Sequence, residues 1–128
     1  MIKFYRTDHK VLSEITEYED NMWVCMTKPT VDETKLIAED FEIDLADVRA
    51  AFDDEESSRV EVEDGYTLIL VDIPSIEMRN EREAYTTIPL GIILVKDILI
   101  TVCAEDTPVL DAFIESKVKE FSTKKRMR

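Results

Sequence analysis

Glycine, proline, cysteine and histidine are all scarce in this chain of 128 residues. It holds 2 glycines, 4 prolines, 2 cysteines and 1 histidine, while 45% of its residues are hydrophobic. So little glycine and proline in so apolar a chain excludes an intrinsically disordered protein and indicates one soluble domain with its own core. The chain also lacks a glycine-rich phosphate-binding loop, and its few cysteine and histidine residues do not form a zinc site with the usual spacings. We therefore expect no enzymatic activity and no organic cofactor.

Long apolar runs are absent as well. No stretch approaches the roughly 20 apolar residues that a membrane-spanning helix needs, and residues 1–8 already alternate like a strand, so we expect no signal peptide. Cys25 and Cys103 both fall in predicted strands. A disulfide between them is possible if those strands are neighbours, but buried reduced thiols are favoured. These features together predict a cytosolic domain.

Charge is divided unevenly along the chain. The formal net charge is −13, yet residues 117–128 carry six basic residues and one acid, which leaves −18 on residues 1–116 and +5 on the tail. An acidic body argues against nucleic acid as a partner, because phosphate binding depends on lysine and arginine. It suits cations or basic partners better. The simpler alternative is that the charge only keeps the domain soluble.

The strongest strand patterns lie between Arg59 and Cys103. Valines alternate with glutamates from Arg59 to Glu63, and Asp64-Gly65 then supplies a two-residue turn into the apolar run Tyr66–Ile73, which predicts a hairpin. The runs 90–95 and 98–103 are separated by only Lys96-Asp97, so they must also be antiparallel neighbours. The apolar runs indicate central strands that are covered on both faces.

Other segments complete a layered α/β pattern. Strands are expected at 2–7, 11–16 and 23–26, a loop at the hairpin tip 78–83, and a strand over 85–95 with a bend or bulge at Pro89 and Gly91. Thr30 and Glu33 form a capping box that opens a helix over 31–41, and Asp44 opens a second, short helix. We predict an α/β fold of three α/β/α layers around a mixed, largely antiparallel sheet.

A last helix begins at Thr107-Pro108, a cap followed by a proline at the first helical position. Apolar residues then recur every three or four positions, and no stop signal follows Phe121. We expect residues 1–106 to form the body of the domain and residues 107–128 to begin a longer helix. The sequence is thus interpreted as a fragment of a longer protein.

The order of these motifs resembles the cytosolic amino-terminal domain of the CorA-like divalent-cation transporters. The resemblance covers nearly the whole chain from Trp23 onward. It is carried by the following stretches: Trp23-Val24 leading to Pro29 and a capped helix, Ile43-Asp44, Arg59-Val60-Glu61 before Tyr66, the hairpin 92–102 with Ile100-Thr101-Val102, and Thr107-Pro108-Val109.

The resemblance implies a regulatory unit of a membrane channel. Such a domain sits on a funnel-shaped homo-oligomer, a pentamer, and its last helix extends through a stalk to membrane-spanning segments in the cell membrane. The Gly-Met-Asn pore signature of the family does not occur here, so the resemblance implies sensing and gating rather than transport by this chain. The transported and regulatory ion would be Mg²⁺, with Co²⁺ and Ni²⁺ as alternatives.

In relatives, an acid near the end of the second helix contributes to a Mg²⁺ site between neighbouring domains. The matching position here is Ala50, which cannot bind a metal. Carboxylates nearby could substitute, because Mg²⁺ prefers oxygen ligands; the candidates are Asp47, Asp53, Asp54, Glu55 and Glu56. The bland alternative for the acidic run is a solvated loop, and Asp47 could merely favour the amino end of its own helix.

A stand-alone soluble domain is the competing interpretation of the whole sequence. In that case a small α/β unit would bind a protein partner through its acidic face. The uncapped basic end of the chain distinguishes the two hypotheses, since it is an odd ending for a complete domain and an expected one for the start of a stalk.

Overall fold

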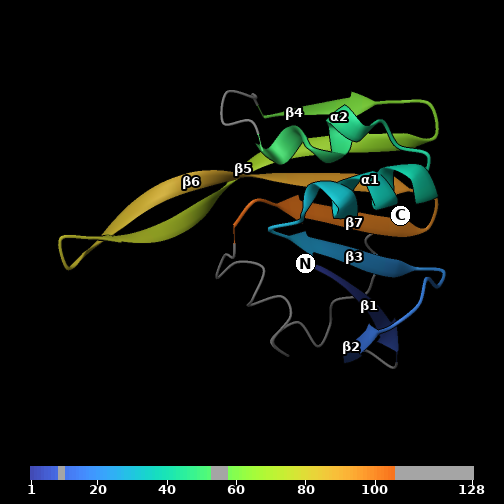
Figure 1. Cartoon of the computed structure of the whole chain (residues 1–128), viewed down its shortest axis with the longest axis horizontal. Helices are drawn as coiled ribbons and strands as arrows, with labels where there is room; N and C mark the ends of the chain where they lie inside the picture. Colours follow the sequence, from blue (N-terminus) through green and yellow to red (C-terminus); the bar gives the residue numbers. More distant parts are fainter. Residues whose placement is uncertain (9–10, 53–57, 106–128) are drawn as a thin grey trace.

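A single seven-stranded sheet forms the body of the protein (Figure 1). The computed structural model describes residues 1–8, 11–52 and 58–105. Across the sheet the strands run in the order β2-β1-β3-β7-β6-β5-β4. Their bounds are β1 Ile2–Asp8, β2 Val11–Ile15, β3 Met22–Thr27, β4 Arg59–Val62, β5 Tyr66–Arg79, β6 Arg82–Val95 and β7 Ile98–Cys103.

The sheet is mixed and largely antiparallel, as the sequence predicts. Five of its six neighbouring pairs are antiparallel, and only β3 and β7 run in parallel. The two predicted hairpins, β4–β5 and β6–β7, are both confirmed. β7 is the central strand of the sheet, whereas β5 lies next to the edge strand β4 and is less central than predicted.

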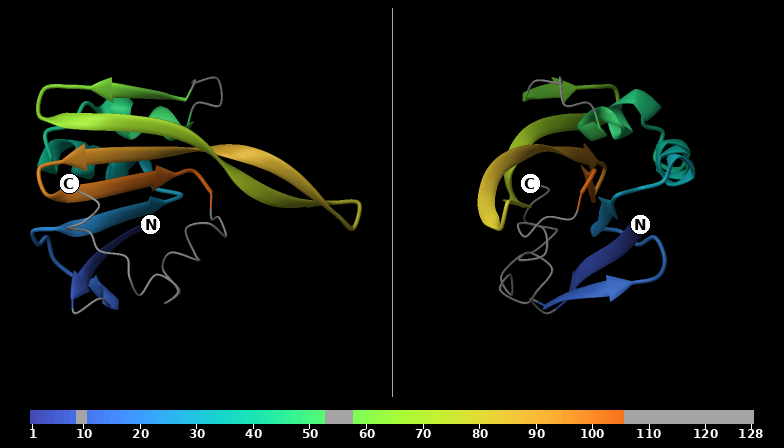
Figure 2. Two further views of the ribbon diagram at one scale, coloured as in Figure 1. Left: turned by 180° about the vertical axis from the view of Figure 1, so that it is seen from behind. Right: turned by 60° about the vertical axis from the view of Figure 1, so that its left-hand side comes forward.

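The described helices pack on one face of the sheet (Figure 2). They are α1 Val31–Asp40, α2 Leu45–Val48 and a 3-10 turn, η1, Ala50–Phe52. The core beneath them is built from fully buried side chains such as Ile37, Val48, Leu68 and Ile100. Alternation along the strands brings Leu68 and Ile100 to the face that the helices cover, where Ile37 and Val48 pack on them. This burial fixes the register of the strands.

A second apolar cluster occupies the opposite face. Tyr5, Trp23 and Leu99 belong to it, and the indole Nε1 of Trp23 donates a hydrogen bond of 2.8 Å to Thr101 Oγ1. Cys25 and Cys103 lie here too, on neighbouring strands, and both thiols are buried. The helix expected to cover this face, and with it the third layer, falls in residues 107–128, outside the described residues.

The structure corrects the prediction for the hairpin between β5 and β6. Instead of a loop over 78–83, the two strands pair without a break from Tyr66↔Val95 to Arg79↔Arg82, and only Asn80 and Glu81, both at positive φ, form the turn. A bend or a bulge was predicted at Pro89 and Gly91; the register is continuous there, so the bulge alternative is wrong. The polar, mixed-charge sequence of residues 78–83 hid the strand pattern, because it shows no apolar alternation.

The capping box of α1 is present and gives a first testable expectation. Thr30 Oγ1 accepts from the backbone N–H of Glu33 at 3.1 Å, and Glu33 Oε1 accepts from that of Thr30 at 2.8 Å. The latter bond, with the Met1 ammonium adding to it, lowers the pKa of Glu33. Thr30→Ala should therefore reduce the free energy of unfolding by about 1 kcal/mol, measured by urea denaturation, whereas Thr30→Ser should stay near the parent protein. Equal losses in both variants would contradict the capping role.

Candidate functional site: three carboxylates between α2 and β4

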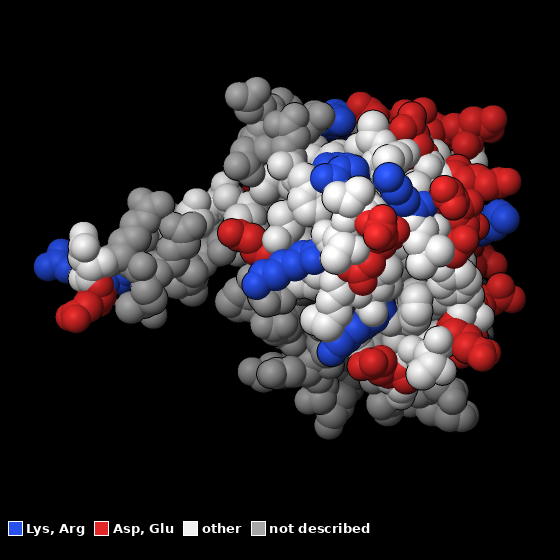
Figure 3. Space-filling model, in the orientation of Figure 1, with Lys and Arg blue, Asp and Glu red and all other residues white. Residues whose placement is uncertain are grey.

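Acidic side chains gather at one end of the sheet (Figure 3). The turns β4–β5 and β6–β7 and the carboxyl end of α1 all reach this end (Figure 1). The loop between β2 and β3 is joined to this end by Tyr18, whose hydroxyl donates a 2.5 Å hydrogen bond to Oδ2 of Asp40 at the end of α1. Strand order alone brings these loops together, so acids that are far apart in sequence become neighbours.

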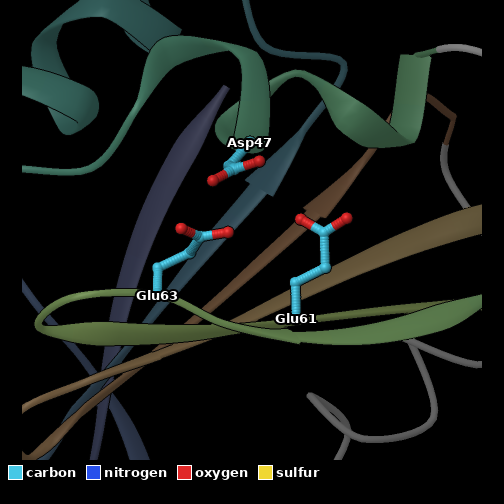
Figure 4. A group of neighbouring side chains, drawn as sticks. All are labelled: Asp47, Glu61 and Glu63. Carbon is cyan, nitrogen blue, oxygen red and sulfur yellow. The ribbon is translucent and has the colours of Figure 1, made fainter.

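Three carboxylates within this region lie especially close together. They belong to Asp47, Glu61 and Glu63, and one oxygen from each lies within 4.8 Å of the others. Asp47 points from α2 toward the two glutamates, which come from β4 and the residue after it (Figure 4). Asp47 and Glu61 are partly buried and Glu63 is exposed. Solvent can therefore reach the cluster from one side.

The position of Asp47 is fixed by Tyr66 at the start of β5. The phenol of Tyr66 donates a 2.5 Å hydrogen bond to Asp47 Oδ2 and accepts one of 3.3 Å from the backbone N–H of Asp44. Asp44 is the N-cap of α2, its Oδ1 accepting from the N–H of Ala46 at 3.0 Å. Burial of the ring, followed by the bond to Asp47, raises the pKa of Tyr66 to about 12. Tyr66 thus joins α2 to the sheet and stays protonated at neutral pH.

Two described residues offset part of the charge of the cluster. Arg59 Nε lies 2.6 Å from Glu61 Oε1 on the same strand, and Tyr66 supplies a neutral donor to Asp47. Two like charges about 5 Å apart repel by about 1 kcal/mol in a water-like dielectric and several times more in a protein-like one. A divalent cation with oxygen ligands would relieve this repulsion, and Mg²⁺ in particular binds one or two carboxylates while it retains several waters.

The structure places the predicted site residues unequally. Asp47 lies in the cluster, whereas the run Asp53–Glu56 lies outside the described residues. Ala50, the position that the resemblance matches to an acid, is 5% exposed and belongs to the core.

Glu61 and Glu63 are the residues that sequence reasoning missed. Their alternation with valine indicated that both lie on one face of a strand, and this signal was visible. What the sequence did not show is that α2 lies over that face, because the contact depends on how the helix crosses the sheet.

The architecture is shared with solved structures of transporter domains. The soluble domain of CorA from Methanocaldococcus jannaschii matches with a TM-score of 0.73 and 20% identity over 98% of this chain and 50% of that one. The complete CorA magnesium transporter of the same organism matches at 0.66 and 15%, over 88% and 35%. The cytoplasmic domain of ZntB from Vibrio parahaemolyticus matches at 0.68 and 13%, over 94% and 50%. At these identities the likeness establishes the fold.

The chain thus spans between a third and a half of the length of these structures. Among the described residues no helix has the length and apolar character needed to cross a membrane. A comparison with curated proteins finds no match. The family model described as the CorA-like Mg²⁺ transporter protein matches residues 18–126, and the chain therefore belongs to the CorA-like Mg²⁺ transporter family.

Proposed function

We propose that this chain is the cytosolic, ion-sensing domain of a divalent-cation transporter whose membrane-spanning part lies elsewhere in the full-length protein. Membership of the CorA-like family and the likeness to soluble and cytoplasmic domains of transporters support this role. The full-length protein would reside in the cell membrane as a homo-oligomer, a pentamer, with this domain in the cytoplasm. The proposal assigns the chain no catalytic activity and no nucleic-acid partner.

One observation carries the sensing role: carboxylates of Asp47, Glu61 and Glu63 from two separate segments converge within 4.8 Å. They supply hard oxygen ligands with net negative charge, which suits Mg²⁺. Co²⁺ or Ni²⁺ would find no imidazole or thiolate in this cluster, and such ions favour nitrogen and sulfur ligands more than Mg²⁺ does. Mg²⁺ is therefore the proposed regulatory ion, and the family description makes it the proposed transported ion as well.

The proposed mechanism is a shift between two arrangements of α2 and β4 within the domain. A cation bound at the cluster holds α2 close to β4 by screening the mutual repulsion of the carboxylates. When the cation leaves, this repulsion acts again and favours an arrangement in which the elements separate. A ligand shifts such an equilibrium only by its difference in affinity for the two states, so the closed arrangement must bind the ion more tightly.

Thermal unfolding with and without Mg²⁺ tests the ligand assignment. At an ion concentration ten times the dissociation constant, binding should stabilise the domain by about 1.4 kcal/mol, which raises Tm by a few degrees in a domain of this size. The double variant Asp47→Asn, Glu63→Gln should lose this shift. A potassium salt at matched ionic strength separates binding from general screening.

Matched variants separate the cluster from other acids. Asp20→Asn with Asp97→Asn removes the same number of charges from exposed positions outside the cluster, and it should retain the Mg²⁺ shift. Asp53→Asn with Asp54→Asn tests the predicted acidic run in the same way. If the Asp47 and Glu63 variant kept the full shift while the Asp53 and Asp54 variant lost it, the ligands would lie in that run and the cluster assignment would be wrong.

The stand-alone interaction domain remains the second candidate, and the acidic end of the sheet favours it (Figure 3). The mass and membrane partitioning of the native protein, detected with an antibody to this domain, distinguish the two. A membrane-bound species much larger than 14.8 kDa is expected for the transporter. A soluble species near that mass would overturn the proposal and direct the search toward a basic protein partner.

A further inference from the structure

A two-stranded arm projects from the body beyond the rest of the sheet (Figures 1 and 2). β5 and β6 pair along their whole length, whereas β4 accompanies β5 only up to Leu70 and β7 accompanies β6 only from Leu90. The pairs from Asp72↔Pro89 to Arg79↔Arg82 thus form a ribbon about 25 Å long at ~3.3 Å per residue. Isolated two-stranded ribbons are marginally stable in water, so this arm needs a further contact.

The prolines decide which edge of the arm can accept another strand. Proline lacks an N–H, and within a sheet it turns its nitrogen toward the unpaired side. Pro74 therefore interrupts the outer edge of β5 within the arm, and Pro89 lies at the base of β6. Beyond Pro89, residues 82–88 of β6 carry no proline. The nitrogen of Pro89 faces outward, and backbone N–H groups alternate in direction along a strand. The backbone groups of Thr87, Tyr85 and Glu83 therefore face outward too.

The edge strand β4 offers a complementary surface. It is the last strand of the described sheet. Glu63 donates its N–H to the carbonyl of Tyr66 at 2.9 Å, and by alternation the outward backbone groups of β4 belong to Val60 and Val62. Their side chains are 64% and 80% exposed, whereas Glu61 and Glu63 lie on the helix-covered face with Asp47.

We propose that the outer edge of β6 in the arm adds to β4 of a second copy of this chain as an antiparallel strand. Among the registers that set outward groups opposite outward groups, we select the one that pairs Val60 with Tyr85, because it also pairs Glu63 with Arg82. The pair of Glu63 with Arg82 brings opposite charges together across the two strands. Because the arm points away from its own β4 (Figure 1), the contact joins different copies. It rests on the homo-oligomer of the proposed function.

A contact between two different surfaces of identical chains is heterologous. Repeated around an axis, it closes a ring if the rotation permits, and otherwise it continues as a filament. An isologous contact of β4 with β4 is the alternative. On oxidation it would link the single variant Val60→Cys to itself.

Disulfide trapping in the full-length protein in its membrane tests the register. Directly opposed residues that exchange hydrogen bonds have Cα atoms about 5.5 Å apart, within the range that a disulfide spans. The variant Val60→Cys, Tyr85→Cys should form covalent ladders of several copies on mild oxidation, while either single variant should not. EDTA is included so that no divalent cation competes for Glu63.

Two further variants test the edge and the ion pair. Replacing Glu83 and Thr87 by proline removes outward N–H groups while sparing the pairing of the arm with β5, and should lower the ladder yield about tenfold, or about 1.4 kcal/mol. Glu83→Gln with Thr87→Val, which keeps both N–H groups, should not. Glu63→Arg alone should lower the yield, and adding Arg82→Glu should restore it.

The outcomes separate this inference from the proposed function. If the protein is a membrane-bound oligomer but Val60→Cys links only to itself or to another protein, or the proline variant keeps its ladders, the arm contact is wrong while the transporter proposal stands. If the protein is a soluble monomer, both fall. Ladders that depend on both cysteines and on the free edge support the arm contact.

Discussion

Replacing Ala50 by aspartate is expected to lower the free energy of unfolding by about 3–5 kcal/mol and to create no ion site. The substitution restores the acid that the resemblance to the family implies at this position. Ala50, however, is the first residue of η1, is 5% exposed and packs in the core. A carboxylate there would lose its hydration without a partner. Urea denaturation of the domain measures the loss.

The pH dependence identifies the cause of that loss. Burial raises the pKa of a carboxyl group in the folded state above its unfolded value of about 4. The penalty relative to the parent protein should therefore be full at neutral pH and shrink as the pH falls through the raised value. Ala50→Asn, similar in size but without charge, should show a smaller and pH-independent loss. A stable Ala50→Asp variant with an enlarged Mg²⁺ shift would instead place the ion site at residue 50.

The elements that sequence predicted well are those with local, unambiguous signals. The capping box at Thr30 and Glu33 gave the start of α1, and the two-residue turns at Asp64-Gly65 and Lys96-Asp97 gave both hairpins of the body. Each signal involves only neighbouring residues and specifies backbone geometry directly. The parallel pairing of β3 with β7 could not be predicted in this way, because more than 70 residues separate the two strands.

The arm was predicted wrongly for a different physical reason. Its sequence from Met78 to Glu83 is polar and mixed in charge, which usually indicates a loop. Strand alternation is expected only where one face is buried, and the buried residues of the ribbon, Ile73 and Ile88, lie at its base. The local signal for the turn, Asn80-Glu81, was present but had no flanking pattern to mark it as the tip of a ribbon.

The sequence predicted only one of the three carboxylates of the candidate site, because the other two are distant from it in sequence. Asp47 was found from its place on the second helix, but the convergence with Glu61 and Glu63 requires α2 to cross β4. Tyr66 makes that crossing specific, since its single hydroxyl bonds to residues of α2. Nothing in the sequence near Tyr66 marks the phenol as more than a strand aromatic.

Tyr66→Phe is expected to cost about 1.5–3 kcal/mol, because the ring stays buried while the hydrogen bond to a charged acceptor is lost. In the parent protein the pKa of Tyr66 is raised to about 12 from 10.0, chiefly by burial and then by the bond to Asp47. The protonated phenol is thus the form that stabilises the fold. Its contribution is complete below pH 10 and is lost as the pH rises toward 12. The variant should lack this part of the alkaline decline.

Tyr18→Phe is the matched control. The pKa of Tyr18 is also raised to about 12, by burial and by its bond to Asp40, but its side chain is 45% exposed and the loss should be smaller. A double-mutant cycle of Tyr66→Phe with Asp47→Asn then isolates the bond between α2 and the sheet. A coupling above about 0.5 kcal/mol is expected for directly bonded residues. Additive losses would mean that Tyr66 acts through packing alone, and that the position of Asp47, and with it the cluster, depends on other contacts.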